Sequence, residues 1–244
     1  MKKYSYVGIS FIILVFGILF VPRIINRIKE GTVSKNERPS ANQTVKSGEL
    51  GYLKIHDEPK KVPEFAFLNQ DSLMITHHDY KGKVYLVDFF FTHCPTICPK
   101  MTSNLKYISE QFKDNDDFGI VSFSIDPKRD TPMQLKKYAE NYGITHPNWN
   151  LLTGKRDDIY ELANNGFTIP VLENADVPGG FEHSGYFALI DQDGYFRSRY
   201  DDMGNPIIVY RGTVSVPEKS VDGEEEQVTI LIEDIEKLLE NGKQ

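Results

Sequence analysis

The chain has 244 residues, 40% of them hydrophobic and 26% charged, which is ordinary for a globular protein and sufficient for one well-buried domain. Its formal net charge is −7, and because residues 1–29 carry five positive and no negative charges, the remainder carries −12. Such an acidic domain repels phosphate backbones, which argues against nucleic acid as a partner, and two cysteines are too few for a multi-bridge disulfide scaffold.

The first segment of the chain is a candidate membrane anchor. Residues 4–21 form an uncharged stretch of 18 residues rich in Ile, Leu, Val and Phe, preceded by two lysines and followed by Pro22. This length is enough to span a bilayer. No small-x-small cleavage site follows, so we predict an uncleaved transmembrane anchor within residues 1–29 rather than a removed signal peptide. Basic residues lie on both sides of the stretch, and their count alone leaves the orientation open.

A polar segment separates this anchor from the rest of the chain. Residues 30–51 contain few apolar side chains, and we expect a flexible tether that holds a soluble domain off the membrane. The domain itself is predicted over residues 52–244.

Strand and helix patterns alternate along this domain. Their order is β-α-β-α, then a hairpin, then α, which is typical of a thioredoxin-like α/β fold with helices on both faces of a mixed sheet. Binding sites in open α/β sheets form beyond the carboxyl ends of the strands. Strands are predicted at residues 62–68, 84–91, 118–125, 149–152, 185–190, 195–200 and 207–210, helices from near Pro95 to Phe112, from an Asp130 N-cap to Tyr142, and at 157–165 and 228–239, and an exposed acidic loop at 221–227.

The only two cysteines, Cys94 and Cys98, lie between a predicted buried strand and a predicted helix. A helix N-terminus carries partial positive charge and N–H groups without helical partners, so it stabilises a thiolate. If the helix begins near Pro95, the i,i+4 spacing brings both sulfurs toward one face, close enough to share a metal or to form a disulfide. The alternative is a buried structural thiol pair, which we disfavour because packing cysteines rarely lie at a strand-to-helix turn flanked by prolines.

A third ligand would come from one of the six histidines. His183 precedes the first hairpin strand, and in a thioredoxin-like layout that loop packs against the cysteine loop. Two thiolates and one imidazole form a soft, low-coordinate site that favours Cu(I) and can hold Cu(II), whereas zinc requires a fourth ligand for a closed site. His93 competes because it adjoins Cys94, but it lies on the other side of the loop from Cys98. We expect the remaining histidines to be solvated or structural: His56, His77, His78 and His146.

Two acidic residues follow the next strand. Asp126 and Asp130 could form a second layer beneath the thiols, or they could serve as a strand terminator and a helix N-cap. We favour the second interpretation for both residues.

Three motifs together resemble the Sco/SenC family. They are Phe91-Thr92-His93-Cys94-Pro95-x-x-Cys98-Pro99, then Ser124-Ile125-Asp126-Pro127-x-x-Asp130-Thr131, then His183-Ser184 before a strand that ends in Asp-x-x-Gly. The resemblance runs from roughly residue 60 to residue 200, in the order and spacing of the family.

The resemblance implies a membrane-anchored, thioredoxin-fold copper protein in the cell inner membrane, with its N-terminus inside and its domain facing the periplasm or the outside. It implies copper, as Cu(I) or Cu(II), bound by Cys94, Cys98 and His183. It also implies a role in assembling the dinuclear copper centre of cytochrome c oxidase, by delivering copper or by reducing the cysteines of that centre. The implied partners are a copper-receiving oxidase subunit and an upstream copper donor or thiol reductant.

Two features depart from the family pattern. Thr96 stands where many relatives have an acidic or amide residue, which bears on the redox behaviour of the loop. Residues 201–227 are more numerous than expected between the hairpin and the last helix, and could hold an extra strand pair that changes partner recognition.

Three hypotheses about function remain at this point. The first is a copper-binding assembly factor, a metallochaperone that is not an enzyme in the turnover sense. The second is a thiol-disulfide oxidoreductase in which Cys94 and Cys98 cycle and His183 tunes a thiolate. The third, a peroxidase-like use of Cys94, is weaker because Phe91 occupies the Thr position of the usual Thr-x-x-Cys pattern.

Overall fold

The computed structural model describes residues 13–16, 18, 20–22, 48–201, 205–221 and 223–242. The chain divides into two compact units, residues 1–45 and residues 46–244. Within the described residues, no helix combines the length and the apolar character that a membrane span requires. Most of the anchor predicted at residues 4–21, and most of the tether predicted at residues 30–51, lies outside the described residues.

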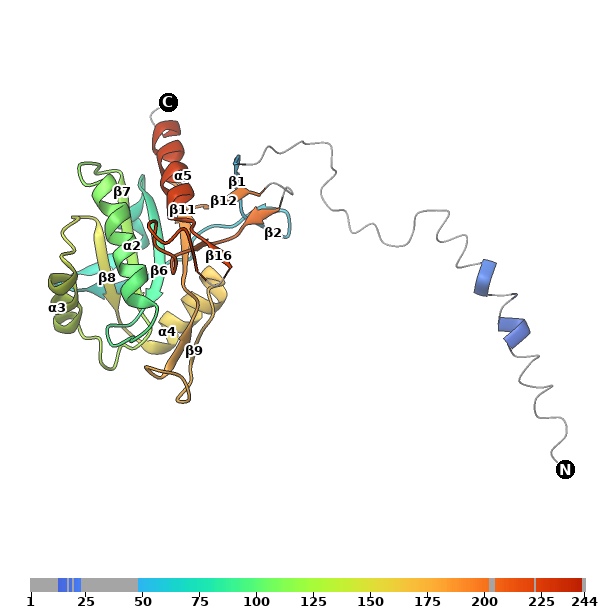
Figure 1. Cartoon of the computed structure of the whole chain (residues 1–244), viewed down its shortest axis with the longest axis horizontal. Helices are drawn as coiled ribbons and strands as arrows, with labels where there is room; N and C mark the ends of the chain where they lie inside the picture. Colours follow the sequence, from blue (N-terminus) through green and yellow to red (C-terminus); the bar gives the residue numbers. More distant parts are fainter. Residues whose placement is uncertain are drawn as a thin grey trace. The chain divides into compact units, whose positions relative to one another are not determined.

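The second unit is built on one mixed β-sheet. Its strands are β1 (Leu50–Tyr52), β4 (Ala66–Asn69), β5 (Met74–Thr76), β6 (Val84–Phe90), β7 (Phe118–Ser124), β8 (Trp149–Thr153), β11 (Tyr186–Ile190), β12 (Phe196–Tyr200), β13 (Pro206–Ile207) and β14 (Tyr210–Arg211). They lie in the order β1-β12-β11-β6-β7-β8-β4-β5, with β13 beside β12 and β14 beside β11 (Figure 1). β6, β7 and β8 run parallel, and the other neighbours pair antiparallel.

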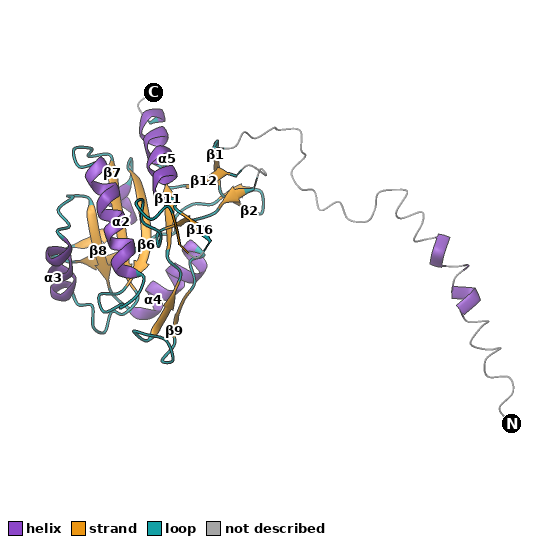
Figure 2. Cartoon of the chain, in the orientation of Figure 1, coloured by secondary structure: helices purple, strands orange, loops and turns teal. Residues whose placement is uncertain are grey.

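Helices and three small hairpins complete this unit (Figure 2). The hairpins pair β2 (Lys54–Ile55) with β3 (Glu58–Pro59), β9 (Val171–Glu173) with β10 (Phe181–His183), and β15 (Ser220–Val221) with β16 (Glu224–Glu225). The helices are the 3-10 turn η1 (His77–Tyr80), α2 (Cys98–Gln111), α3 (Pro132–Tyr142), α4 (Arg156–Glu161), the π-helix η2 (Leu162–Phe167) and α5 (Val228–Asn241).

The central strands are buried because helices cover them on both faces. β6 and β7 are each seven residues long, and every one of these residues is buried. Strands of this kind are continuous apolar runs rather than alternating ones. Right-handed crossovers from β6 to β7 and from β7 to β8 put α2 and α3 on one face of the sheet. The hydroxyls of Thr102 and Tyr138 accordingly lie 2.7 Å apart between these two helices.

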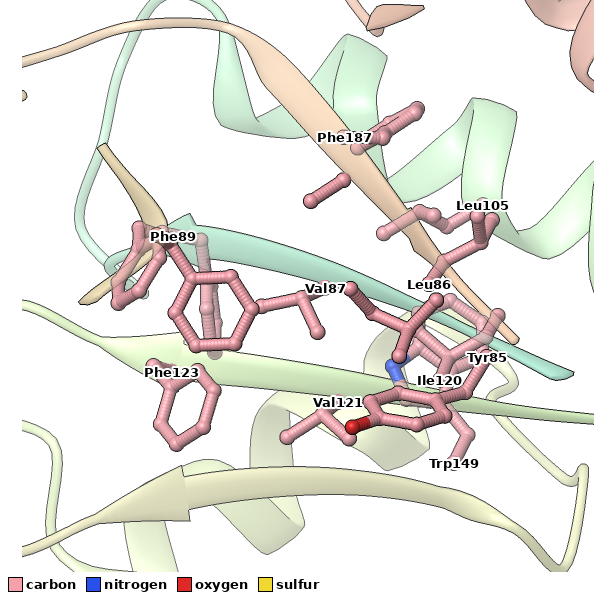
Figure 3. Close-up of a cluster of buried hydrophobic side chains, with 14 of the residues drawn as sticks. Tyr85, Leu86, Val87, Phe89, Leu105, Ile120, Val121, Phe123, Trp149 and Phe187 are labelled. Carbon is pink, nitrogen blue, oxygen red and sulfur yellow. The ribbon is translucent and has the colours of Figure 1, made fainter. Parts of the chain in front are cut away.

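An aromatic cluster fills the opposite face of the sheet. Phe89 of β6 stacks on Phe123 of β7 with ring centroids 5.3 Å apart (Figure 3). The ring centroid of Phe167 in η2 lies 5.8 Å from that of Phe89. Each of these rings is 0 or 1% exposed. Aromatic side chains bury large areas, so this cluster holds η2 against the sheet.

The strand predicted at residues 62–68 is the shorter β4, and four of the elements predicted after β7 also differ in detail from the structure. Two differences concern helices. The helix predicted at residues 157–165 changes from α4 to the π-helix η2, which contains two asparagines and a glycine, all weak α-helix formers. The second is the N-cap of α3, which is Thr131 rather than the predicted Asp130.

The other two differences lie between β12 and α5. The single strand predicted at residues 207–210 is two short ones, because β13 pairs with β12 whereas β14 pairs with β11. The acidic loop predicted at residues 221–227 contributes to the β15–β16 hairpin. The stretch of residues 201–227 therefore adds strands to the fold, as the sequence suggested.

An ionisable side chain of β6 lies inside the core, on the face of the sheet that α2 covers. Asp88 in β6 is 2% exposed, and Ser122 Oγ donates to its Oδ1 at 2.5 Å. The indole Nε1 of Trp149 donates in turn to Ser122 Oγ at 3.1 Å. Burial raises the pKa of Asp88 to about 7, against the weaker lowering effect of the hydrogen bond from Ser122. The folded state therefore binds this proton more tightly than the unfolded state does.

Candidate metal centre

The cysteine loop connects the end of β6 to the start of α2. It comprises residues 91–97 and leaves the carboxyl edge of the parallel strands, where binding sites form in sheets of this class. The N–H of Cys94 donates to the carbonyl of Phe91 at 3.2 Å, which closes a turn before the helix. α2 begins at Cys98. The predicted helix start near Pro95 is therefore wrong, and Cys94 lies in the loop.

The two cysteines nevertheless face each other across the helix N-terminus. The backbone N–H of Cys98 donates to Cys94 Sγ at 3.5 Å, and Thr96 Oγ1 lies 3.6 Å from the same sulfur. Cys94 is 8% exposed and Cys98 is 1% exposed. Because the first N–H groups of a helix have no intrahelical partner, one that is directed at a sulfur stabilises negative charge there. Cys94 is thus the more accessible of the two sulfurs, and the first N–H of α2 is directed at it.

The surroundings of the inner thiol favour its neutral form. Burial raises the pKa of the Cys98 thiol, and the hydrogen bond to the Cys94 side chain raises it further. A bound metal cation reverses this balance, because a coordinating thiol loses its proton. Two adjoining sulfurs, one near the surface and one deep, fit a soft cation such as Cu(I) better than a hard one.

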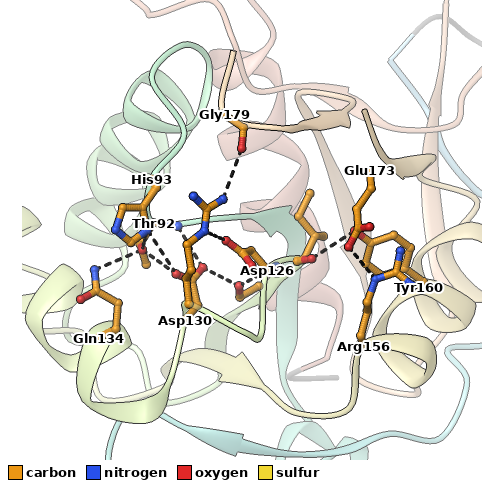
Figure 4. A network of polar contacts seen from close by, with 12 residues as sticks. Thr92, His93, Asp126, Asp130, Gln134, Arg156, Tyr160, Glu173 and Gly179 are labelled. Atoms are coloured by element: carbon orange, nitrogen blue, oxygen red, sulfur yellow. Dashed lines mark hydrogen bonds and ion pairs between the residues drawn. The ribbon is translucent and has the colours of Figure 1, made fainter. Parts of the chain in front are cut away.

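A buried carboxylate fastens the cysteine loop to the sheet (Figure 4). The backbone N–H of Thr92 donates to Asp130 Oδ2 at 3.0 Å, and Thr92 Oγ1 donates to Asp130 Oδ1 at 2.5 Å. Ser124 Oγ donates to Asp130 Oδ2 at 2.5 Å. Asp130 is 0% exposed. The favoured role of Asp130 as an N-cap is wrong, because the adjoining Thr131 accepts the first-turn N–H instead. Asp130 holds the start of the cysteine loop.

A second set of contacts joins the same corner to the β9–β10 hairpin. Asp126 lies two residues after the end of β7 and accepts a hydrogen bond from Arg129 Nε, while Arg129 Nη2 donates to the Gly179 carbonyl at 3.3 Å (Figure 4). The ring of Phe181 lies 5.0 Å from that of Phe91. Gly179 has φ +89°, and a Cβ there would lie 2.9 Å from the Phe91 ring, so only glycine allows this approach. The hairpin is thus packed directly on the cysteine loop.

The predicted third ligand lies on that hairpin. His183 is the last residue of β10 and pairs with Val171 of β9, but its side chain is not among the described ones. Beside this contact, a pocket of about 530 Å³ lies between the hairpin and the second half of the cysteine loop. Among the side chains that the structure describes, no three His, Cys, Asp or Glu residues are grouped closely enough to hold a metal ion. The pocket is lined from the loop side by Thr96 and Ile97, and from the hairpin side by residues that include Phe181, Glu182 and Ser184.

The competing histidine, His93, contacts the group of polar residues around Asp130, named the Asp130 cluster, which consists of Thr92, Ser124, Asp130 and Gln134. His93 Nδ1 lies 2.9 Å from Thr92 Oγ1 and 3.8 Å from Asp130 Oδ1, and its side chain is 48% exposed. Gln134 Nε2 donates to the same Thr92 hydroxyl at 3.2 Å (Figure 4). The polar contacts of the His93 ring are therefore with the start of the loop and with the residues that precede α3.

The other histidines have separate places in the fold. His146 is 8% exposed, and because its Nδ1 accepts the Asn148 N–H, its Nε2 donates to the Phe112 carbonyl at 3.2 Å. Burial lowers the pKa of His146, which favours the neutral ring of a structural histidine. His77 is half-buried and His78 is exposed in η1, with ring centroids 3.9 Å apart. His56 is an exposed turn residue with φ +52°.

Sequence reasoning assigned no role to several residues that shape this site. Thr92 and Ser124 stand in the family motifs without a role of their own, and Arg129 is a variable position of the second motif. A signal for Asp130 was available, because Thr131 before a proline already supplies an N-cap with a first-turn proline. The contact of Arg129 with Asp126 is local, but no local pattern places Arg129 against the hairpin, since Gly179 and Phe181 are about fifty residues away in the sequence.

Comparison with known proteins gives relatives over the same region. The SCO1 protein homolog of Bacillus subtilis (strain 168) is 37% identical over 147 residues, which cover 59% of this chain and 76% of that protein. A solved SCO1/SenC family lipoprotein from Bacillus anthracis str. Ames has a TM-score of 0.58 at 31% identity, covering 74% of this chain and 95% of that one.

Two further solved structures similar to this chain are of Sco proteins. BsSco is described as a member of the Sco family of cytochrome c oxidase assembly proteins in which a disulfide switch was identified. It has a TM-score of 0.51 at 36% identity, covering 61% of this chain and 87% of that one. ScoI of Arabidopsis thaliana with copper bound shares the fold, with a TM-score of 0.54 at 23% identity, covering 74% and 98%. The model of the SCO1/SenC family matches residues 54–216. The chain belongs to the SCO1/SenC family.

Proposed function

We propose that this protein is a copper chaperone that binds one copper ion through Cys94, Cys98 and His183 and helps to assemble the dinuclear copper centre of cytochrome c oxidase. The observation that carries the proposal is that both cysteines lie at the N-terminus of α2, with the backbone nitrogen of Cys98 3.5 Å from Cys94 Sγ. Two thiolates and an imidazole are a donor set suited to Cu(I).

The placement of the histidine strand supports the third ligand. β10 ends at His183, and its hairpin packs on the cysteine loop through Phe181 and Gly179. His93, by contrast, has polar partners in the Asp130 cluster. Family membership and the copper-bound ScoI of Arabidopsis thaliana agree with copper as the ion.

The cellular setting follows from the same proposal. A thioredoxin-like domain would be held by a single transmembrane anchor at residues 4–21 and would face the periplasm or the outside. The description of BsSco as a cytochrome c oxidase assembly protein supports an oxidase subunit as the recipient of copper. The lipoprotein of Bacillus anthracis supports membrane association of the family without determining how this chain is anchored.

A second function has an observation of its own. The Cys98 N–H contact to Cys94 Sγ stabilises an attacking thiolate as well as a ligand, so the pair could reduce the cysteines of the receiving protein. The disulfide switch described for BsSco points in the same direction. Because Cu(I) binding requires both thiols in reduced form, copper delivery and thiol reduction can alternate in one protein.

A Cu(I) titration of the full-length chain in detergent, in competition with a chromophoric chelator, tests the proposal. We expect the reduced chain to bind one tight equivalent, because both thiols are available as ligands. The chain oxidised to a Cys94–Cys98 disulfide is expected to bind none. The proposal fails if the reduced chain loses Cu(I) to a moderate chelator, or if the oxidised chain binds it equally well.

A further inference from the structure

The stretch between the β11–β12 hairpin and α5 reaches the proposed copper site. Residues 210–218, named the strap here, begin with β14, which pairs Arg211 with Tyr186 of β11. The next N–H, from Gly212, donates to the Gly185 carbonyl at 2.7 Å. Gly185 is separated from His183 by one residue, so the strap is bonded to the chain segment that directly follows the proposed histidine ligand.

The same strap is bonded from its other side to the helix that begins at Cys98. Asn104 of α2 donates through Nδ2 to the carbonyl oxygens of Gly212 at 2.8 Å and of Val214 at 3.1 Å. Asn104 is 4% exposed and Val214 is 1% exposed. Carbonyl groups buried in this way need donors, and one amide nitrogen supplies both.

The strap packs closely against residues 183–187, named the histidine segment. A Cβ built on Gly185 would lie 2.1 Å from Thr213 Cγ2, and a Cβ built on Gly212 would lie 2.3 Å from the Phe187 ring. Both positions tolerate only glycine without displacement. The histidine segment therefore packs tightly against the strap, and the strap is hydrogen-bonded to α2.

We propose that Asn104 is a positioning residue for the copper site, and that the strap transmits its effect to His183. The inference rests on the proposed function, since it concerns how two of the proposed ligands are held relative to each other. Cys98 is the first residue of α2, and His183 lies two residues before Gly185, which the strap contacts. Asn104 joins the strap to α2. Ligands held at a set separation bind a metal more tightly, because less order is lost on binding.

Asn104 is the buried link between α2 and the strap. Lys100 of α2 also reaches the strap, with its Nζ 3.5 Å from Glu218 Oε1, but these side chains are 44% and 41% exposed. An exposed ion pair contributes little to stability, so the expected effect of Lys100 on the site is small.

Substitution of Asn104 tests the proposal in the full-length chain. Asn104→Asp keeps the size of the side chain but replaces the donor with an acceptor that repels both carbonyls, and Asn104→Leu removes the donor. We expect Cu(I) affinity to fall about 10–100-fold in both variants, as for other residues that orient metal ligands, and the electronic spectrum of the Cu(II) form to change.

The matched control is Asn148. Its Nδ2 also donates to two backbone carbonyls, those of Asp116 and Phe118 at 3.0 Å each, but at the opposite end of β7 from the cysteine loop. Asn148→Asp is expected to lower the melting temperature while Cu(I) affinity and the Cu(II) spectrum stay those of the wild type. Cu(I) affinity within about twofold of the wild type in a folded Asn104→Asp or Asn104→Leu variant would overturn the proposal.

A compensating pair of substitutions tests the same contact without touching Asn104. Gly185→Ala creates the 2.1 Å clash with Thr213 Cγ2, whereas Thr213→Ala leaves only a Cβ at 3.5 Å, an ordinary contact. We expect Gly185→Ala to weaken Cu(I) binding at least about tenfold, and the double variant Gly185→Ala/Thr213→Ala to recover most of it. A double variant as weak as Gly185→Ala alone would contradict transmission through the strap.

Hydrogen exchange of the Gly212 amide, measured on the copper-free chain, separates this inference from the proposed function. Faster exchange in Asn104→Asp than in the wild type is expected, because the strap loses its link to α2. If the wild type binds no Cu(I), the proposed function fails, and the amide exchange still reports whether Asn104 holds the strap. Unchanged exchange would overturn the positioning role itself.

Discussion

Replacement of Asp130 by alanine is expected to destabilise the chain by about 3–5 kcal/mol and to weaken Cu(I) binding about 10–100-fold. The carboxylate accepts three hydrogen bonds, from the Thr92 N–H, the Thr92 hydroxyl and the Ser124 hydroxyl, and is fully buried. Removing it leaves these donors without their partner inside the protein, which costs about 1–3 kcal/mol each. The start of the cysteine loop is then released from β7.

Asp191 provides the matched control for this prediction. It is 4% exposed and accepts the N–H groups of Asp193 and Tyr195 and a bond from Arg197, so its removal carries a similar cost. It follows β11, whose end pairs with the beginning of β6, far along that strand from the cysteine loop. Asp191→Ala should lower stability but preserve Cu(I) affinity. Equal losses of affinity in both variants would show that Asp130 acts only through global stability.

Substitution of Asp88 by asparagine is expected to stabilise the chain at pH 8 by up to about 4 kcal/mol and to have little effect near pH 4. Asparagine keeps the Oδ1 that accepts the Ser122 hydroxyl but carries no charge. In the wild type, burial raises the pKa of Asp88 to about 7, whereas the unfolded chain has the ordinary value near 3.9. The folded state therefore retains a proton over a range in which the unfolded state has lost it.

The pH window of this effect follows from these two pKa values. The extra stability of the protonated wild type is fully present below about pH 4 and is lost as the pH rises through about 7. The measurement is denaturant unfolding of both chains from pH 4 to pH 8, with the exposed Asp117→Asn variant as the control. A constant difference between Asp88→Asn and the wild type across this range would contradict the raised pKa.

The elements that sequence patterns predict well are those set by local periodicity. The apolar runs of β6 and β7 and the helical spacing of Met101, Leu105 and Ile108 are confirmed, because burial on two faces or on one helix face leaves a direct trace in the sequence. The strap and the β9–β10 hairpin leave no such trace. Their strands are two or three residues long and depend on partners distant in the sequence.

The proposed copper site likewise combines features that local sequence predicts with features that depend on distant residues. Cys94 and Cys98 are near each other in the sequence, so their contact could be predicted, although the helix start was placed too early. Asp130 was misassigned because an acidic residue before Thr131 and a proline satisfies the N-cap pattern equally well, and only the fold brings it to Thr92. The packing of Gly185 against Thr213 depends on residues 28 positions apart and has no local signature.

The ligand set is the central claim, and Cu(I) affinity of single-site variants tests it most directly. The full-length, reduced chain would be titrated against a chelator as wild type, Cys98→Ser, His183→Ala and His93→Ala. Serine and alanine offer Cu(I) no soft donor, so the first two variants are expected to lose more than about a hundredfold in affinity. His93→Ala should stay within about threefold of the wild type, because its ring contacts the Asp130 cluster. A His183→Ala chain that binds Cu(I) like the wild type would contradict the three-ligand site.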